Sequence, residues 1–156
     1  MKRLIILVGN IASGKTTLVK DLVKLGYLVL SRDDIRYMLG GGEYIWDTNL
    51  EKIIKDIQLS LLRKIVRKKY DVVIDGTNMS MMSREDALAI ANKAGYETIA
   101  YVMPKISKKK SVERRLANNH GNTTKKQWED IWLKFDMWYE EPTHEEGFNK
   151  IHHKLN

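Results

Sequence analysis

The sequence predicts an α/β fold, a three-layer sandwich in which helices cover both faces of a central parallel sheet of four to five strands. Short apolar segments of strand length alternate along the chain with longer segments whose apolar residues have helical spacing. The strand segments are apolar almost throughout, which is typical of parallel strands buried on both faces. At 156 residues the chain is long enough for a real core, and we expect one domain over residues 1–156.

The first two expected strands flank a helix. Residues 4–8 form an unbroken apolar run, and residues 18–23 have apolar residues at helical spacing. Gly26 is expected to end this helix, because glycine readily adopts the left-handed conformation of a C-cap. Residues 27–30 are apolar again and predict the second strand.

A short helix and an open segment follow the second strand. Residues 35–39 have helical character, and the side chain of Asp33 or Asp34 can cap their first turn. The three glycines at 40–42 end this helix, and we expect residues 43–48 to form a loop.

The strand–helix alternation continues through the middle of the chain. Residues 49–69 predict a long helix, since their apolar residues recur every three or four positions. Residues 71–75 predict the third strand and residues 97–103 the fourth. Between them, residues 83–94 predict a helix that starts with Ser83 in a pattern close to a capping box.

Two further helices and a short strand are expected near the C-terminal end. Residues 107–118 predict a basic helix, residues 124–139 an amphipathic helix, and a short last strand is expected within 148–155. Tryptophans can stack on bases, but helical spacing favours the core for three of the four, which are Trp128, Trp132 and Trp138. Trp46 lies in the polar loop and is expected to be exposed.

Composition restricts the compartment and the partners. The net charge of +7 suits a polyanionic partner such as nucleic acid, although many small basic proteins bind none. The chain has no cysteine, which excludes disulfides and thiolate zinc sites. No apolar run approaches the roughly 18 residues of a membrane span, and the run after the basic N-terminus is a strand rather than an export signal. We therefore expect a cytoplasmic protein with no membrane partner, and the oligomeric state stays open.

A phosphate-binding loop is predicted between the first strand and the first helix. Its residues are Gly9, Asn10, Ile11, Ala12, Ser13, Gly14, Lys15, Thr16 and Thr17. The spacing Gly-x-x-x-x-Gly-Lys-Thr between a strand and a helix is the P-loop, or Walker A motif. Backbone N–H groups then face the phosphates of ATP, Lys15 adds a positive charge, and Thr16 ligates Mg²⁺. We therefore expect a P-loop kinase-like fold, although the loop alone also suits an ATPase or a GTPase.

Acidic residues follow the second and third strands. Asp75 ends the third strand, where a carboxylate can hold Mg²⁺ or its waters; the alternative is a turn residue before Gly76. Asp33 follows the second strand and could accept the proton of an attacking hydroxyl, with Arg36 on the same side of a helical turn. The alternative there is a cap formed by Asp34 together with solvated charges.

A basic segment at about residues 105–122 is expected to form a lid over the nucleotide phosphates. Its cationic residues are Lys105, Lys108, Lys109, Lys110, Arg114 and Arg115. Arg114 or Arg115 would stabilise negative charge on the transferring phosphoryl group. The alternative for the lysines is an ordinary solvated helix face.

In order along the chain, these motifs resemble the polynucleotide 5′-kinase family, the kinase half of the kinase–phosphatase end-healing enzymes. The resemblance rests on the P-loop, on Arg32-Asp33-Asp34-Ile35-Arg36, on Asp75-x-Thr77-Asn78 and on the basic helix. It implies ATP- and Mg²⁺-dependent phosphorylation of a 5′-hydroxyl on DNA or RNA.

The resemblance also implies a role for each matching residue. Asp33 corresponds to the general base, and Arg36 to the arginine that contacts the phosphate on the 3′ side of the reacting nucleotide. Thr77 and Asn78 correspond to the pair near the substrate, and we place Arg32 with them in the substrate group. Lys15, Arg114 and Arg115 join Asp33 as catalytic residues, and Thr16 and Asp75 are the metal residues.

The sequence departs from the family at two places. The family often has Pro-Gly where this chain has Ile11-Ala12, which we expect to be a mild change because these positions need not be glycine. The family usually has two lid arginines about four residues apart, but no second arginine stands at that spacing here. Either the adjacent pair Arg114-Arg115, or Asn119 or His120, is expected to replace it, or the transition state is stabilised less strongly than in the family.

We therefore expect an ATP-dependent polynucleotide 5′-hydroxyl kinase. One alternative is a related P-loop kinase acting on a nucleoside, a nucleotide or a hydroxymethylated base in DNA. A second alternative is a non-catalytic nucleic-acid-binding module that uses the nucleotide as a switch.

Overall fold

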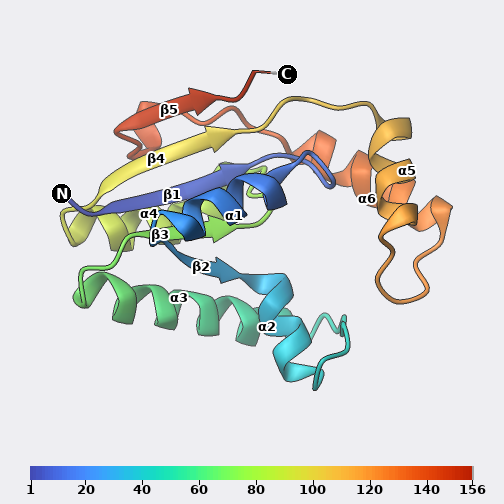
Figure 1. The fold of residues 1–156 in the computed structure, drawn as a ribbon, viewed down its shortest axis with the longest axis horizontal. Helices are drawn as coiled ribbons and strands as arrows, with labels where there is room; N and C mark the ends of the chain where they lie inside the picture. The colour runs from blue at the N-terminus through green and yellow to red at the C-terminus, as the bar shows by residue number, and fades with distance from the viewer. Residues whose placement is uncertain (156) are drawn as a thin grey trace.

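Five parallel strands form the central sheet of the computed structural model, which describes residues 1–155 (Figure 1). The strands are β1 (Arg3–Val8), β2 (Leu28–Ser31), β3 (Val72–Asp75), β4 (Glu97–Val102) and β5 (Lys150–His153). Their order across the sheet is β2-β3-β1-β4-β5, and every neighbouring pair is parallel. The predicted parallel α/β sheet is confirmed.

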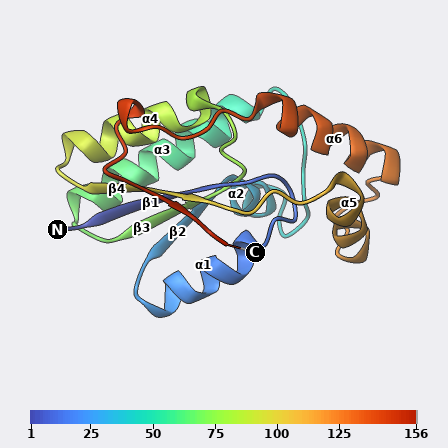
Figure 2. The ribbon, with the colours of Figure 1, turned by 90° about the horizontal axis from the view of Figure 1, so that it is seen from above.

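Helices cover both faces of this sheet. They are α1 (Lys15–Lys24), α2 (Arg32–Leu39), α3 (Glu51–Arg67), α4 (Met81–Lys93), α5 (Lys108–Ala117) and α6 (Lys125–Trp138), with a short 3₁₀ turn, η1, at His144–Glu146. Figure 2 shows α1 on one face and α3 and α4 on the other. α5 and α6 lie beyond the carboxyl ends of the strands (Figure 1). None of the helices within residues 1–155 is long and apolar enough to cross a membrane.

The two faces of β1 explain why its sequence is apolar throughout. Alternate side chains of a strand point to opposite faces of the sheet. Leu4 and Ile6 pack in the core on the side of α3 and α4, whereas Ile5 and Leu7 pack with Leu22 of α1. Because both faces are covered, the strand shows no polar alternation.

The carboxyl ends of the strands bring distant loops together. Ser31 at the end of β2 is in register with Asp75 at the end of β3. The backbone N–H of Gly9, which follows β1, donates to the carbonyl of Thr77 at 2.9 Å. The loops after β1, β2 and β3 therefore meet at one edge of the sheet, where doubly wound folds bind their ligands.

Serine residues, not the expected side chains, cap two of the helices. The Ser31 hydroxyl accepts a hydrogen bond from the Asp34 N–H at 3.3 Å and caps α2. The expected cap by Asp33 or Asp34 is therefore wrong, and both carboxylates lie in the first turn instead. Helix α4 is likewise capped by Ser80 rather than beginning at Ser83.

The tryptophans divide into core and surface residues. Trp128 and Trp132 pack in a small cluster with Ile11 of the P-loop and Val112 of α5, as expected for core residues. Trp138, also expected in the core, is 50% exposed, because the last turn of α6 runs past this cluster. Trp46 is 59% exposed, as predicted.

Candidate active site

Two glycines shape the P-loop, residues 9–17. Gly14 has φ of 94° and caps the N-terminus of α1. A Cβ at Gly9 would lie 2.7 Å from both the Met103 Cβ and the Ser13 Oγ. The close approach of β4 to the loop therefore requires glycine at position 9, and the left-handed backbone favours it at position 14.

Ala12 also lies in the left-handed region, with φ of 54°. This conformation costs an L-residue with a Cβ about 1 kcal/mol or more. Position 12 therefore favours glycine, although alanine occupies it here, so this departure from the family adds strain to the loop. The strained turn is held from outside, because the Ala12 carbonyl accepts a hydrogen bond from Arg114 Nη1 at 2.9 Å.

The Lys15 ammonium lies inside the concave face of the P-loop. Its Nζ donates to the carbonyls of Gly9 and Asn10 at 2.7 Å each, and to Ser13 Oγ at 3.1 Å. Burial lowers the pKa of Lys15 to about 7; the carboxylate of Asp75 opposes this shift. A cation lodged among neutral carbonyls suits a polyphosphate, which would supply the missing negative charge.

Asp75 is close enough to Lys15 for their charges to interact. Burial raises the pKa of the Asp75 carboxyl, Lys15 lowers it, and Asp33 and Asp34 raise it. The structure thus brings together carboxylates from the ends of two strands and the P-loop lysine. Within the described chain, no three acidic or histidine side chains cluster tightly enough to hold a metal. The hydroxyl of Thr16 and the carboxylate of Asp75 still suit Mg²⁺, which retains waters and binds through few protein ligands plus substrate phosphates.

Asp33 is held by two donors but is still open to solvent. Its Oδ1 accepts from Arg36 Nη1 at 2.8 Å and from the Tyr44 hydroxyl at 3.3 Å. Its side chain is 54% exposed. Burial raises the pKa of Tyr44 to about 12, so its hydroxyl remains a donor at neutral pH. A carboxylate that is oriented and yet accessible can receive an incoming hydroxyl group.

Glu51, at the start of α3, fixes the Arg36 guanidinium. Its two carboxylate oxygens accept from Arg36 Nε at 3.1 Å and from Nη2 at 2.6 Å. The Arg36 side chain is only 8% exposed. Sequence reasoning did not single out Glu51, because it lies fifteen positions from Arg36 and no helical spacing connects them.

The remaining residues predicted to bind substrate are engaged with the protein itself. Arg32 Nε donates to Gln58 Oε1 of α3 at 3.0 Å. Asn78 has φ of 44°, and its Nδ2 donates to the Leu7 carbonyl of β1 at 2.7 Å. Thr77 accepts the Gly9 N–H through its carbonyl. Thr77 and Asn78 thus fasten the loop after β3 to the P-loop strand, and their contact with a substrate stays a prediction.

The basic helix α5 packs directly against the P-loop. Ser111 Oγ donates to the Ile11 carbonyl at 2.7 Å, next to the bond between Arg114 and Ala12. Arg115 lies over the Trp128 ring at 5.3 Å, and its buried Nε has no hydrogen-bond partner among the described residues. The positive charge of Arg115 also lowers the pKa of Lys15. Both arginines therefore lie at the phosphate-binding loop, whereas Lys109 of the same helix has only the exposed position expected for a solvated helix face.

The two candidates for the second lid position differ in their surroundings. Asn119 is committed to the fold: its Oδ1 accepts from Trp128 Nε1 at 3.1 Å and its Nδ2 donates to the Thr123 carbonyl at 2.8 Å. His120 instead stacks on Tyr44, with ring centroids 4.1 Å apart. Burial lowers the pKa of His120, and Arg115 adds to that shift. Of the two, His120 is therefore the residue beside the Asp33 site.

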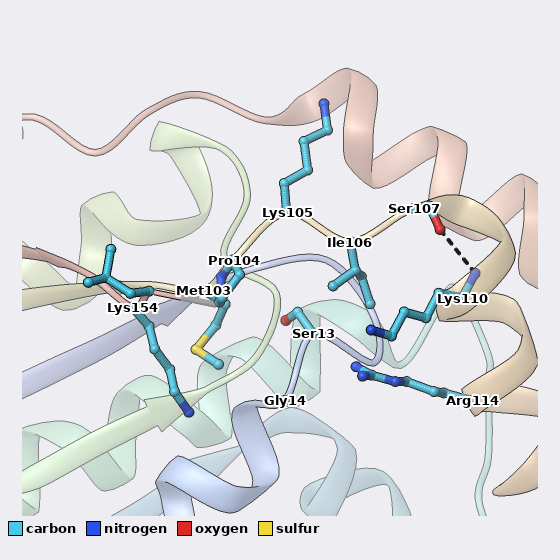
Figure 3. Close-up of a pocket in the computed structure, with 11 residues that line it drawn as sticks. Ser13, Gly14, Met103, Pro104, Lys105, Ile106, Ser107, Lys110, Arg114 and Lys154 are labelled. Carbon is cyan, nitrogen blue, oxygen red and sulfur yellow. Dashed lines mark hydrogen bonds between the residues drawn. The ribbon is translucent and has the colours of Figure 1, made fainter.

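A cleft of about 500 Å³ opens beside the P-loop (Figure 3). Its lining residues are Ser13, Gly14, Met103, Pro104, Lys105, Ile106, Ser107, Lys110, Arg114, Lys154 and Leu155. Figure 3 shows Lys110 and Arg114 extending from α5 toward the P-loop, with Lys154 on the opposite side of the cleft. Apolar walls beside a phosphate loop and four cationic side chains suit a nucleoside triphosphate. Lys154 was not predicted, because it follows β5, far along the chain from the P-loop.

Comparison with known proteins agrees with this geometry. Residues 4–142 match the family model AAA_33, described as an AAA domain. A curated relative, the L-seryl-tRNA(Sec) kinase of Methanococcus maripaludis, is 29% identical over 120 residues. That match covers 71% of this chain and 46% of the relative, so the chain spans about half the relative's length.

Solved structures share the fold. A chain of the Pnkp1/Rnl/Hen1 RNA repair complex superposes with a TM-score of 0.69 at 20% identity, covering 87% of this chain and 44% of the other. Kti12 of Chaetomium thermophilum, in complex with ADP-AlF3, superposes with a TM-score of 0.62 at 20% identity, covering 97% and 88%. These likenesses show the P-loop kinase fold.

Proposed function

Because the chain belongs to the AAA domain family AAA_33 and has a P-loop kinase fold, we propose that it is an ATP-dependent kinase of the 5′-hydroxyl of DNA or RNA. One observation carries the proposal. Asp33, oriented by Arg36 and Tyr44, lies in the first turn of α2, directly after β2, and is close enough to Lys15 to affect its pKa. A site that only hydrolysed or sensed a nucleotide has no need of this second, exposed carboxylate.

The donor side of the site would bind and neutralise the ATP phosphates. Lys15 would exchange its carbonyl partners for phosphate oxygens, and the P-loop N–H groups would donate beside it. Arg114 and Arg115 would stabilise charge on the transferring phosphoryl group. Thr16 and Asp75 would hold Mg²⁺, which when bound neutralises charge between the β- and γ-phosphates.

The acceptor side would position the hydroxyl. Asp33 would accept the hydroxyl proton and orient the oxygen in line with the γ-phosphate, since positioning dominates catalysis of this loose transition state. Arg36 would bind the phosphate on the 3′ side of the reacting nucleotide. Its guanidinium has five N–H donors, and Asp33 and Glu51 occupy three of them, which leaves two for a phosphate.

A transfer assay with γ-labelled ATP tests the function directly. The acceptors are 5′-OH DNA, 5′-OH RNA, duplex ends, nucleosides and DNA with hydroxymethylated bases. We expect label at the 5′ end of DNA or RNA, and no label on any 5′-OH end would contradict the proposal. Label on nucleosides or modified bases alone would favour the related small-acceptor kinases.

The seryl-tRNA kinase relative makes a second acceptor worth including, the hydroxyl of a seryl group carried on tRNA. Arg36→Ala separates the acceptor classes: it should slow transfer to oligonucleotides, which carry a 3′-side phosphate, more than transfer to simple nucleosides, which lose only the orientation of Asp33 by Arg36. The ratio of the two rates within the one variant cancels any loss of folded protein.

A nucleotide-switched binding module would instead show steeply salt-dependent nucleic-acid binding and label no acceptor.

Binding of ATP should take up protons at alkaline pH. Free Lys15, with its pKa of about 7, is mostly neutral at pH 8, and the polyphosphate should raise that pKa and restore the ammonium. We expect an uptake of up to about one proton per ATP at pH 8 and much less at pH 6, where Lys15 is already charged. Calorimetry in two buffers of different ionisation enthalpy measures the uptake.

Lys15→Arg is the matched control for this uptake, because arginine stays charged at both pH values. Its proton uptake at pH 8 should be close to zero, whatever the change in affinity. Equal uptake by the wild type and by the arginine variant would show that another group carries the proton.

A further inference from the structure

Trp46 is a large exposed ring next to the acceptor side of the site. It lies in the segment between α2 and α3, after the glycines at 40–42. The residue is 59% exposed, whereas Trp128 and Trp132 are almost fully buried. An exposed aromatic ring beside the acceptor side of the site is available for stacking on a base.

Arg36 connects this ring to the reacting carboxylate. The Arg36 guanidinium carbon lies 5.0 Å from the centroid of the Trp46 ring, and the same guanidinium contacts Asp33 at 2.8 Å. Glu51 holds the guanidinium through both of its carboxylate oxygens. The Trp46 indole, the Arg36 guanidinium and the Asp33 carboxylate therefore lie in a row. The guanidinium, in the middle of this row, is held in place by Glu51.

We propose that Trp46 is a stacking platform for a nucleobase at the 5′ end of the acceptor strand. The inference rests on the proposed function and extends it to the substrate. If the 5′-hydroxyl lies at Asp33 and the following phosphate at Arg36, the next side chain along this row is the Trp46 indole. The bases that flank this phosphate belong to the first and second nucleotides of the strand, and one of them stacks on Trp46.

Stacking on this ring would be strong but tolerant of sequence, since every base has an aromatic face. The positive charge of the chain, +7 overall, would attract the strand, and the ring would hold its end in register with Asp33. Each base–aromatic stack lowers the dissociation constant or KM by about 5- to 150-fold in comparable sites.

The test is a double-mutant cycle between the ring and the base. Wild-type protein and Trp46→Ala are each measured with an intact 5′-OH oligonucleotide and with versions lacking the base at position one or two. Fluorescence anisotropy gives the dissociation constant, and labelled-ATP transfer gives KM and kcat. Trp46→Ala and removal of the stacked base should each weaken the wild-type interaction about 5- to 150-fold, and the two together should cost no more than one alone. Removal of the other of these two bases should have little effect.

Two variants and one oligonucleotide serve as controls. Trp46→Phe should retain most of the affinity, because a ring remains. Trp138→Ala removes another exposed indole, which is 50% exposed on α6, and should change nothing. An oligonucleotide lacking its base at position five should bind as well as the intact strand.

Two results would overturn the proposal. If neither the oligonucleotide lacking base one nor the one lacking base two binds the wild type more weakly than the intact strand, no base stacks at this site. If Trp46→Ala weakens intact and abasic strands alike, the ring only supports Arg36. The anisotropy arm needs no catalysis, so absence of phosphoryl transfer would contradict the proposed kinase function while the stacking result is still read from binding.

Discussion

Asp33→Asn should abolish phosphoryl transfer while leaving ATP binding nearly unchanged. The amide has the shape of the carboxylate, and its oxygen can still accept from Arg36 Nη1 and the Tyr44 hydroxyl. It cannot take a proton from the acceptor hydroxyl, and loss of a positioned general base costs about 10²- to 10⁴-fold in rate. Single-turnover transfer measures the rate, and calorimetry measures ATP affinity.

Asp34→Asn is the matched control. Asp34 is the next residue in the same first turn of α2 and is also exposed, so its loss should change the transfer rate by only a few-fold. If Asp33→Asn loses ATP binding and transfer together, Asp33 supports the nucleotide site and is not the base. A loss of transfer in Asp34→Asn as great as that in Asp33→Asn would move the role to its neighbour.

Arg84→Met should be the most destabilising of the variants discussed. The Arg84 side chain is fully buried, and it forms two 2.8 Å hydrogen bonds with Glu146, whose side chain is 2% exposed. Arg84 also donates to the carbonyls of Asn78 and Met79 at 3.0 and 3.2 Å. Its removal leaves a buried carboxylate unpaired, which costs about 3–5 kcal/mol of unfolding free energy. Urea unfolding measures this loss.

Two comparisons make the result specific. Lys126→Ala breaks the exposed Lys126–Asp130 pair of α6 and should cost less than about 1 kcal/mol. The double variant Arg84→Met with Glu146→Leu should be more stable than Arg84→Met alone, because it leaves no unpaired buried charge. A cost for Arg84→Met no greater than that of Lys126→Ala would show that the buried pair contributes little.

Arg84 also connects stability to the site. Its bonds to the carbonyls of Asn78 and Met79 hold the loop after β3, and the Asn78 amide in turn holds the Leu7 carbonyl just before the P-loop. The position of the phosphate-binding loop therefore depends on a buried ion pair whose two members are sixty-two positions apart in the sequence.

Much of the fold and the donor half of the site could be predicted because their signals are local. Apolar runs and helical spacing are read within one element, and the predicted parallel sheet is confirmed. The P-loop is one contiguous segment between a strand and a helix. The proximity of Asp33 and Asp75 could also be predicted, since the carboxyl ends of parallel strands lie at one edge of the sheet.

The local details that failed depend on what lies around each element. Trp138 has the helical spacing of a core residue, but α6 extends beyond the core that Trp128 and Trp132 fill. Ala12 looked conformationally neutral, yet the turn places it in the left-handed region. The spacing of apolar residues shows which side of a helix a residue occupies. It does not show whether another part of the protein packs against that side.

The succession of strands and helices along the chain, the phosphate-binding loop and the two acidic strand ends could be predicted from the residues alone, because each depends on neighbouring residues. The folded chain was needed to show what surrounds them: Glu51 and Tyr44 beside the Arg36–Asp33 pair, His120 against Tyr44, and Lys154 at the cleft beside the P-loop. These contacts join residues from different helices, strands and loops. Such residues have no fixed separation in the sequence, so no pattern in the sequence predicts their contact.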